Sequence, residues 1–180
     1  MSASKLVKLI PCMLLAPFAL AIAYAETPPT HPIRLAVFDF ELEDFSAAAG
    51  LVAENPADRA GLQGASLAAR QFVEESSRYA LVDMSNSDVE AVRTHVLRQC
   101  NGCESQIAKD LGADQSLLGV ITRISQTEYQ IQLVLRDSKS GALILRKQSD
   151  LRMGANYSWG RGVASFVRAA LPPQLTVPIR

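Results

Sequence analysis

The chain has 180 residues with 18 basic and 18 acidic side chains, and 48% of its residues are hydrophobic. The zero net charge hides an uneven distribution of charge, and the export signal described next argues against a nucleic-acid role. The length predicts one domain with a core of its own.

The first 25 residues have the pattern of a secretory signal peptide. Two lysines precede an apolar run over residues 9–22, and Ala23 and Ala25 provide the small residues of a cleavage site after Ala25. The alternative is an uncleaved anchor helix, since the run approaches the roughly 20 residues that span a bilayer. Two prolines in the leader favour cleavage. We therefore expect residues 1–25 to be removed and the mature protein to be periplasmic, without stable membrane insertion.

The remaining chain divides into three parts. Residues 26–32 form a Pro-rich tether, residues 33–171 form a single domain, and residues 172–180 form a C-terminal tail. Within the domain, acidic residues concentrate before position 115 and basic residues after it. Such an asymmetry orients a charged partner, or it marks two differently charged solvated faces.

The first half of the domain alternates strands and helices. The apolar segment 33–42 predicts a strand that is buried on both faces and turns half polar at its far end. A helix is predicted over 58–78, although Gly61 and Gly64 weaken its start, and a short strand over 79–84.

Two capping patterns follow. Ser87 with Glu90 predicts the start of a helix that reaches the cysteines, and Asn101 with Glu104 predicts a second short helix that stops at Gly112.

From residue 115 the hydrophobic period changes from helical to two. Segments 116–124, 127–137 and 142–153 predict an antiparallel meander, and a last helix is predicted over 157–171. The order βαβα followed by βββα predicts a single α/β (α+β) domain, with a mixed sheet of about five strands and helices packed on it.

The mature chain has two cysteines, Cys100 and Cys103. Haem attachment is excluded because Glu104 stands where a histidine is needed, and zinc needs roughly four ligands where only His95 and Asp110 lie near. We therefore expect no cofactor and no metal. A structural disulfide is favoured in an oxidising compartment, and a redox-active pair is the alternative, because a helix N-terminus would lower the pKa of the Cys103 thiol.

Two other groups are candidate sites. Asp39, Glu41 and Glu43 alternate at the end of the first strand, where a ligand or calcium ion could bind, although a strand turning polar explains them more simply. Trp159 and Arg161 are residue types found in partner-binding hot spots, yet Trp159 also fits the core side of its helix.

Five segments resemble, in this order, a family of secreted bacterial proteins whose role is uncharacterised: RLAVFDFEL, SSRYALVDM, QCNGCESQIAKDLGADQSLLGVITRISQ, LVLRDSKSGALI and YSWGRGVASFVRAAL. Its members are distantly similar to the N-terminal domain of the Tol–Pal periplasmic propeller protein and to the curli secretion lipoprotein. The resemblance spans nearly all of residues 33–171, and its most specific piece is the Cys-Asn-Gly-Cys-Glu block. It implies an α/β fold, a periplasmic location and a role in assemblies, with a link to quinoprotein alcohol dehydrogenases or to an envelope assembly, and it implies no reaction.

These observations predict an exported accessory protein that binds an envelope partner, has no catalytic activity and is stabilised by a Cys100–Cys103 disulfide. One alternative is a thiol-disulfide oxidoreductase or redox sensor that uses the same cysteines. A second alternative is a module that binds a small ligand or a metal ion.

Overall fold

The computed structural model describes residues 31–47, 49–50, 56–85, 96–125, 127–152 and 158–171. The expected leader, the C-terminal tail and the predicted capping box of Ser87 and Glu90 lie outside these residues. The strands are β1 (Ile33–Val37), β2 (Glu41–Asp44), β3 (Tyr79–Leu81), β4 (Gln115–Arg123), β5 (Glu128–Asp137) and β6 (Leu143–Arg152). The helices are α1 (Pro56–Glu75), the 3₁₀ helix η1 (Leu97–Gln99), α3 (Cys103–Asp110) and α4 (Trp159–Ala170). None of these helices is long and apolar enough to span a membrane.

The strands form one mixed sheet, which confirms the predicted fold class. β3, β1, β4, β5 and β6 lie in that order, and β2 pairs with β4 beyond the end of β1. β1 runs parallel to β3 and β4, and β2 runs parallel to β4, whereas β4, β5 and β6 form the predicted antiparallel meander. The sheet has six strands rather than about five. The additional strand arises because the first predicted strand is divided in two.

The division of segment 33–42 into β1 and β2 has a local cause. Phe38 still donates its N–H to β4, but the N–H of Phe40 turns away and is accepted by Ser66 Oγ of α1 at 2.9 Å. The ring of Phe40 lies over Gly119 of β4, in the space that a Cβ on this glycine would occupy. The chain therefore leaves the sheet for three residues and returns as β2, so the strand is not continuous.

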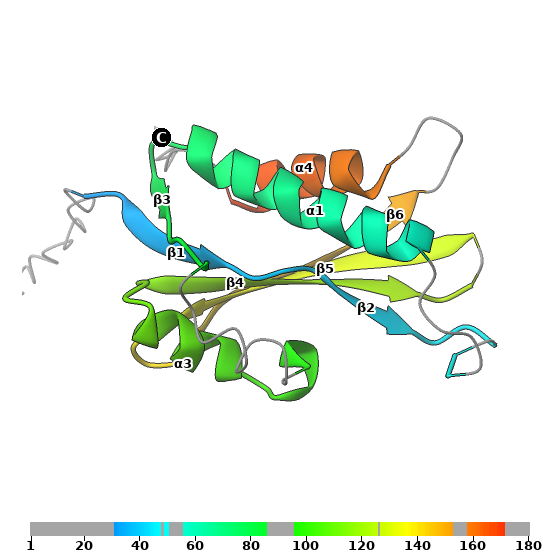
Figure 1. Cartoon of the computed structure of the whole chain (residues 1–180), viewed down its shortest axis with the longest axis horizontal. Helices are drawn as coiled ribbons and strands as arrows, with labels where there is room; N and C mark the ends of the chain where they lie inside the picture. Colours follow the sequence, from blue (N-terminus) through cyan, green and yellow to red (C-terminus); the bar gives the residue numbers. More distant parts are fainter. Residues whose placement is uncertain are drawn as a thin grey trace, which may run out of the picture.

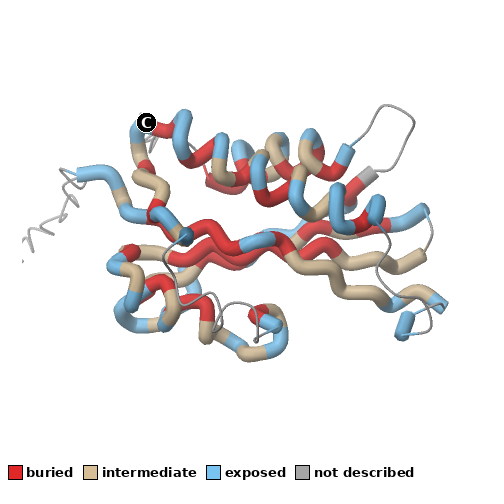
Figure 2. Tube along the Cα trace, in the orientation of Figure 1, coloured by how far each residue is buried: buried red, intermediate tan, exposed pale blue. Residues whose placement is uncertain are grey.

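The helices cover the two faces of the sheet unequally. Figure 1 shows α1 and α4 together on one face and α3 on the other. In Figure 2 the buried positions run along the middle of the sheet and along the sides of the helices that face it. The larger core lies under α1 and α4 and includes Leu35, Val37, Val73, Leu117, Ile121, Ile131, Leu133, Val163 and Val167. The smaller core lies under α3 and η1 and comprises Ala36, Phe38, Val82, Leu97, Ala108, Ala113, Leu118 and Val120.

Charged groups anchor the start of α1 to the sheet. Arg123 at the end of β4 bonds Asp58 of α1 through Nη2 (2.5 Å) and Asp44 of β2 through Nη1 (3.1 Å). Its Nε donates to the hydroxyl of Tyr129 in β5 at 3.1 Å. Hydrogen bonds from Ser46, together with Arg123, hold the pKa of the Asp44 carboxyl below its usual value. Because this network joins α1, β2, β4 and β5, it fixes the angle at which α1 crosses the sheet.

Candidate functional site

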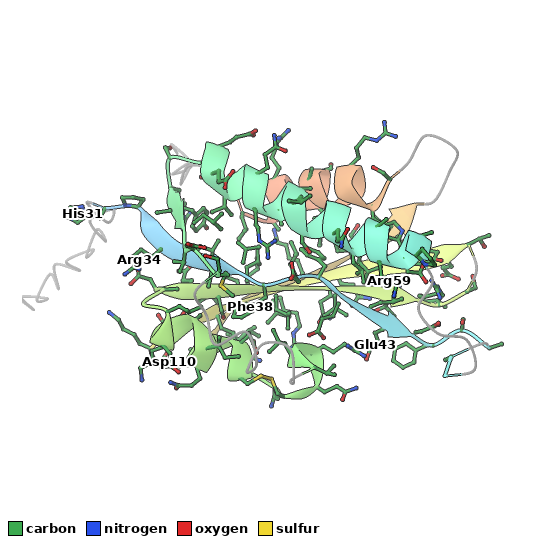
Figure 3. All side chains as sticks on the ribbon, viewed as in Figure 1. His31, Arg34, Phe38, Glu43, Arg59 and Asp110 are labelled. Carbon is green, nitrogen blue, oxygen red and sulfur yellow. A yellow bond between two sulfur atoms is a disulfide. The ribbon has the colours of Figure 1, made fainter. Side chains whose placement is uncertain are left out.

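The cysteines close a sharp turn between η1 and α3, here called the cysteine elbow (residues 97–104). Cys100 and Cys103 form a disulfide with their Cα atoms 5.6 Å apart. Asn101 and Gly102 both have positive φ, at 49° and 118°, and this left-handed pair reverses the chain between the two helices. Figure 3 shows the bridge between the two short helices on the α3 side of the sheet. The disulfide therefore fixes the angle between η1 and α3.

The predicted capping box of α3 is wrong in both of its residues. The N-cap is Gly102, and no side chain bonds to the first turn from that position. Asn101 lies one residue too early because it is needed in the left-handed turn, and its side-chain oxygen is instead 3.5 Å from Arg136 Nη2. Glu104 is only 2% exposed and forms an ion pair with Arg136 of β5, with Oε1 2.9 Å from Nε. Its carboxylate thus binds α3 to the sheet rather than capping the helix.

The elbow is held to the sheet a second time through Glu41 of β2. Its two carboxylate oxygens accept the backbone N–H groups of Leu97 (2.7 Å) and Arg98 (3.1 Å), and Oε2 also accepts Arg98 Nη1 at 3.0 Å. A carboxylate at this place satisfies N–H groups that the first turn of a helix leaves unpaired. Glu41 therefore acts as a cap for η1 supplied from a distant strand.

The three acids predicted at the first strand's end do not come together. Asp39 lies between β1 and β2, and its side chain is 74% exposed and pairs with Arg70 of α1 at 2.8 Å. Glu41 is engaged with the elbow on the other face of the sheet, whereas Glu43 lies near the end of β2, as Figure 3 shows. The ligand role of these acids stays a prediction, and the structure gives each of them a different environment.

In the described ranges, one group of three potential metal ligands lies close together, and it comprises Cys100, Cys103 and Glu104. The donor atoms of these residues lie within 4.8 Å of one another. Because the two sulfur atoms form the disulfide, the group is a bridge with a neighbouring carboxylate in this structure.

Trp159 and Arg161 lie at the start of α4 in different environments. Trp159 is 5% exposed, its ring centroid is 5.5 Å from that of Tyr129, and it packs against Gly61 of α1. Arg161 is exposed, and its backbone N–H is accepted by the N-cap Ser158 Oγ at 3.3 Å. The tryptophan thus belongs to the core side of the helix, and the arginine faces solvent.

Two adjoining hollows lie on the α3 side of the sheet, and both extend to β6. The first, of about 100 Å³, is lined by Leu97, Arg98, Asn101, Gly102, Glu104, Leu118, Val120, Gln132, Val134, Arg136 and Arg146. The second, of about 270 Å³, is lined by Glu43, Phe45, Arg98, Val120, Thr122, Gln130, Gln132 and Gln148. Because they share Arg98, Val120 and Gln132, they form one continuous surface, here called the sheet groove.

The sheet groove is polar and basic at its elbow end. Arg98 and Arg136 are paired with Glu41 and Glu104, whereas Arg146 of β6 forms no ion pair with any described residue. Two buried atoms in this end, Arg98 Nε and Glu104 Oε2, have no hydrogen-bond partner among the described residues. The arrangement suits a carboxylate or another polar group presented by a binding partner.

Sequence reasoning did not find the arginines of the groove. Arg98 lies in the helix that was predicted to reach the cysteines, and Arg136 and Arg146 lie on strands that are distant from it in sequence, so no local motif connects them. Two features of the sequence could have indicated these arginines. They are the basic second half of the domain and the polar positions that alternate along the strands of the meander.

Three solved structures can be compared with this chain. The hypothetical protein CT253 from Chlamydia trachomatis has a TM-score of 0.51 at 12% identity, covering 77% of this chain and 93% of that chain. Lipoprotein GNA1162 from Neisseria meningitidis has a TM-score of 0.48 at 16% identity, covering 77% and 96%. TolB from Acinetobacter baumannii has a TM-score of 0.45 at 12% identity, covering 81% of this chain and 29% of that one. At these identities the likeness to CT253 shows a common fold alone.

No curated protein matches the sequence. The similarity to the curli secretion lipoprotein, and the Cys-Asn-Gly-Cys-Glu block as a mark of the family, stay predictions. The chain matches the family DUF3280, which is described as "Protein of unknown function (DUF2380)", over residues 33–171, and it belongs to that family.

Proposed function

We propose that this chain is an exported envelope protein that binds another protein and catalyses no reaction. The observation that carries the proposal is the surface formed by the sheet groove and β6. This surface combines unneutralised charge at Arg146 with half-exposed apolar side chains at Leu143 and Ile144, which are 49% and 48% exposed. Exposed apolar side chains next to charged side chains are typical of surfaces that bind proteins.

Export is supported by the predicted leader over residues 1–25 and by the disulfide of the elbow. Disulfides persist in oxidising compartments such as the periplasm and are rare in the cytosol, where thiols keep cysteines reduced, so the Cys100–Cys103 bridge supports export. The partner is an envelope protein, and a quinoprotein dehydrogenase or an envelope assembly is the kind of partner that the sequence resemblance implies.

In-cell photo-crosslinking tests the proposal. The photoreactive amino acid benzoylphenylalanine is placed at Gln148, which lies in β6 and lines the sheet groove. The matched control position is Leu67, which is 64% exposed on α1. We expect a crosslinked species in the periplasmic fraction from position 148 and none from position 67. A protein found in the cytosol with its leader intact, or one recovered only as free monomer from both positions, would contradict the proposal.

A second candidate function is thiol-disulfide exchange by the elbow. It is favoured by one observation, the place of Cys103 as the first residue of α3, where the positive end of the helix dipole stabilises a thiolate. Equilibration with a glutathione buffer distinguishes the two functions. A reduction potential below about −300 mV identifies a structural bridge, and one between about −120 and −230 mV identifies an exchanging pair.

The third candidate, a small-ligand or metal-ion site, is supported by the volume of the second hollow, about 270 Å³. Native mass spectrometry of the protein as purified from the envelope checks it, since a retained ligand adds a defined mass to the mature chain.

A further inference from the structure

The further inference concerns the free edge of β6. We propose that β6 pairs antiparallel with β6 of a second copy of this chain, with Gln148 opposite Gln148 and with Arg146 opposite Asp150 on both sides of this centre. The proposal goes beyond the proposed function, because it adds a second occupant. The envelope partner binds the sheet groove, and the second copy binds the edge beside it.

The first step is the open edge. Within the described residues β6 pairs with β5 alone, so the backbone groups on its outer side have no strand beside them. β6 has ten residues, whereas β3, at the other edge of the sheet, has three. An unpaired edge as long as β6 is a template for a further strand. Because β3 is short, pairing through β6 on both copies closes the assembly at two copies.

The second step identifies the residues of β6 whose backbone groups point outward. Asp137 of β5 donates its N–H to the carbonyl of Ala142 at 2.9 Å, and the carbonyl of Glu128 accepts the N–H of Ile124 at 2.9 Å. In β5, therefore, odd-numbered residues bond toward β6 and even-numbered residues toward β4. The register places odd-numbered residues of β6 opposite the odd-numbered residues of β5. The groups left for a further strand belong to Arg146, Gln148 and Asp150.

The same residues carry the charges of the edge. Arg146 lines the first hollow of the sheet groove and Gln148 the second, and Asp150 shares their face because alternate residues of a strand do so. Arg146 and Asp150 are exposed, and neither forms an ion pair with any described residue. Each strand thus offers one cation and one anion, placed symmetrically about Gln148.

The third step is the register of the pairing. When two copies of β6 run antiparallel and are centred on Gln148, Arg146 of each copy stands opposite Asp150 of the other. All of these are hydrogen-bonded pairs, in which the opposite residues exchange two N–H···O bonds. The backbone groups and the charges of the edge are therefore satisfied in one and the same register.

Neighbouring registers lose this match. Centring the pairing on Lys147 places two lysines opposite each other and leaves Arg146 opposite Gln148. Centring it on Ser149 places Asp150 opposite Gln148, which again separates the charges. Charged residues on an edge strand ordinarily oppose pairing, so the sequence of β6 favours one register and disfavours its neighbours.

The opposite face of β6 is compatible with the same register. Lys147 stands opposite Ser149, and Leu145 stands opposite Leu151 of the second copy. Leu151 is buried in the larger core, and Leu145 packs against that core while partly exposed. The pairing therefore brings apolar side chains together on this face and places no two like charges directly opposite each other.

A second copy is chosen as the occupant because of this self-complementarity. A different protein would have to supply an acidic and a basic residue at the matching spacing, and β6 already has both. Because paired residues of neighbouring strands lie on the same face, the pairing sets the two sheet grooves side by side on one face of a joined sheet. A partner that spans both grooves then binds the two copies together.

The pairing of the free protein should be weak. Strands that meet edge to edge bury less area than the roughly 1,200–2,000 Å² of a stable interface. We therefore expect a reversible dimer that forms as the protein concentration rises, and one that an envelope partner spanning both grooves strengthens. Sedimentation of the mature, disulfide-intact protein at low salt, over a concentration series, measures the dissociation constant.

Two single substitutions test the predicted register. In Arg146→Glu two acidic side chains stand opposite each other at both positions, and in Asp150→Arg two arginines do so. Each variant alone should dimerise about tenfold more weakly than the wild type, since two charge pairs change from attraction to repulsion. An equimolar mixture of the two variants should form a heterodimer with the wild-type affinity, and this recovery also shows that both variants are folded.

Matched controls separate the register from the effect of net charge. Lys109→Glu and Asp110→Arg make the same changes of charge at exposed positions of α3, and they should dimerise as the wild type does, alone and mixed. The double variant Arg146→Glu/Asp150→Arg keeps the net charge of the wild type and should again pair with itself. A wild type that stays monomeric over the whole series, or a dimer that neither single substitution weakens, would overturn the inference.

The crosslink from position 148 separates this inference from the proposed function, because its mass shows whether it joins two copies of this chain or this chain and another protein. If the crosslink contains another protein while the free wild type stays monomeric, the inference fails and the proposed function stands. If the dimer follows the charge pattern and no other protein is crosslinked, the proposed function fails and the inference stands.

Discussion

The carboxylate of Glu104 lies 2.9 Å from the guanidinium of Arg136 and joins α3 to β5 in an almost dry environment. The side chains of Glu104 and Arg136 are 2% and 13% exposed, so each charge is stabilised by the other instead of by water. The guanidinium also donates from Nη1 to the carbonyl of Gly141 at 3.2 Å. This pair thus connects the cysteine elbow, the β5–β6 turn and the basic end of the sheet groove.

Breaking the Glu104–Arg136 pair should destabilise the fold strongly. Glu104→Ala leaves a nearly buried guanidinium without its counter-charge, and we expect the free energy of unfolding in urea to fall by about 3 kcal/mol. The control Glu104→Leu/Arg136→Met removes both charges and should recover most of the loss. A single variant as stable as the wild type would show that the pair does not hold α3 to the sheet.

Two glycines of α1 provide a matched comparison of packing. A Cβ on Gly61 would lie 2.6 Å from Trp159 Cε3, whereas nothing lies within 4 Å of a Cβ on Gly64. Gly61→Ala should therefore lower the free energy of unfolding by about 1–3 kcal/mol, and Gly64→Ala should raise it by up to about 1 kcal/mol. Thermal unfolding followed by the fluorescence of the single tryptophan measures both. Equal effects of the two substitutions would contradict the packing of α4 on α1.

Removal of the disulfide should weaken the fold without abolishing it. The bridge closes a loop of four residues, for which the chain-entropy model gives about 2 kcal/mol. We expect Cys100→Ser/Cys103→Ser to lose about this amount in urea unfolding while its far-UV circular dichroism stays that of the wild type. The oxidised wild type treated with a reductant should match the variant. Complete unfolding of the variant would mean that the elbow is essential to the core, and an unchanged midpoint would mean that the bridge contributes nothing.

Asp137, at the β5–β6 turn, should make stability depend on pH. Its carboxylate accepts the backbone N–H of Ser140 at 2.8 Å and the hydroxyl of Ser140 at 2.7 Å, and these bonds lower its pKa below the usual 3.8. A lowered folded-state pKa contributes stability above the unfolded-state value, and this contribution is lost as the pH falls through the folded-state value. Asp137→Ala should therefore be less stable than the wild type at pH 7, and the difference should shrink below about pH 4. A difference that is constant from pH 7 to pH 2 would exclude this role.

Much of the fold could be predicted from periodicity. The change from a helical period to a period of two at residue 115 located the meander, and the stripe of apolar residues located α4. The division of the first strand could not be predicted in this way, because an apolar run has the same pattern whether or not three of its residues leave the sheet. The cause is the contact between Phe40 and Gly119, which are distant in the chain.

The cysteine elbow, too, could be predicted from the sequence only in part, because some of its contacts are with residues distant in the chain. Asn101 and Glu104 have the spacing of a capping box, but Asn101 is also a residue that adopts positive φ readily, and the turn used this property instead. Glu104 was then free to pair with Arg136 across the fold. The Cys100–Cys103 bridge is present where it was predicted, because two cysteines three residues apart with Asn-Gly between them can meet without any distant contact. The groove depends on arginines from η1, β5 and β6, which meet only when the sheet has formed.

Hydrogen exchange over Leu143–Arg152 tests most directly the claim that this protein binds a partner through β6. The mature protein is compared alone and in the complex recovered from the envelope after crosslinking at Gln148. We expect partner-dependent protection of amides in β6, on the side not paired with β5, while α1 and α4 exchange as in the free protein. Unchanged exchange throughout β6, with protection of another surface, would contradict the claim.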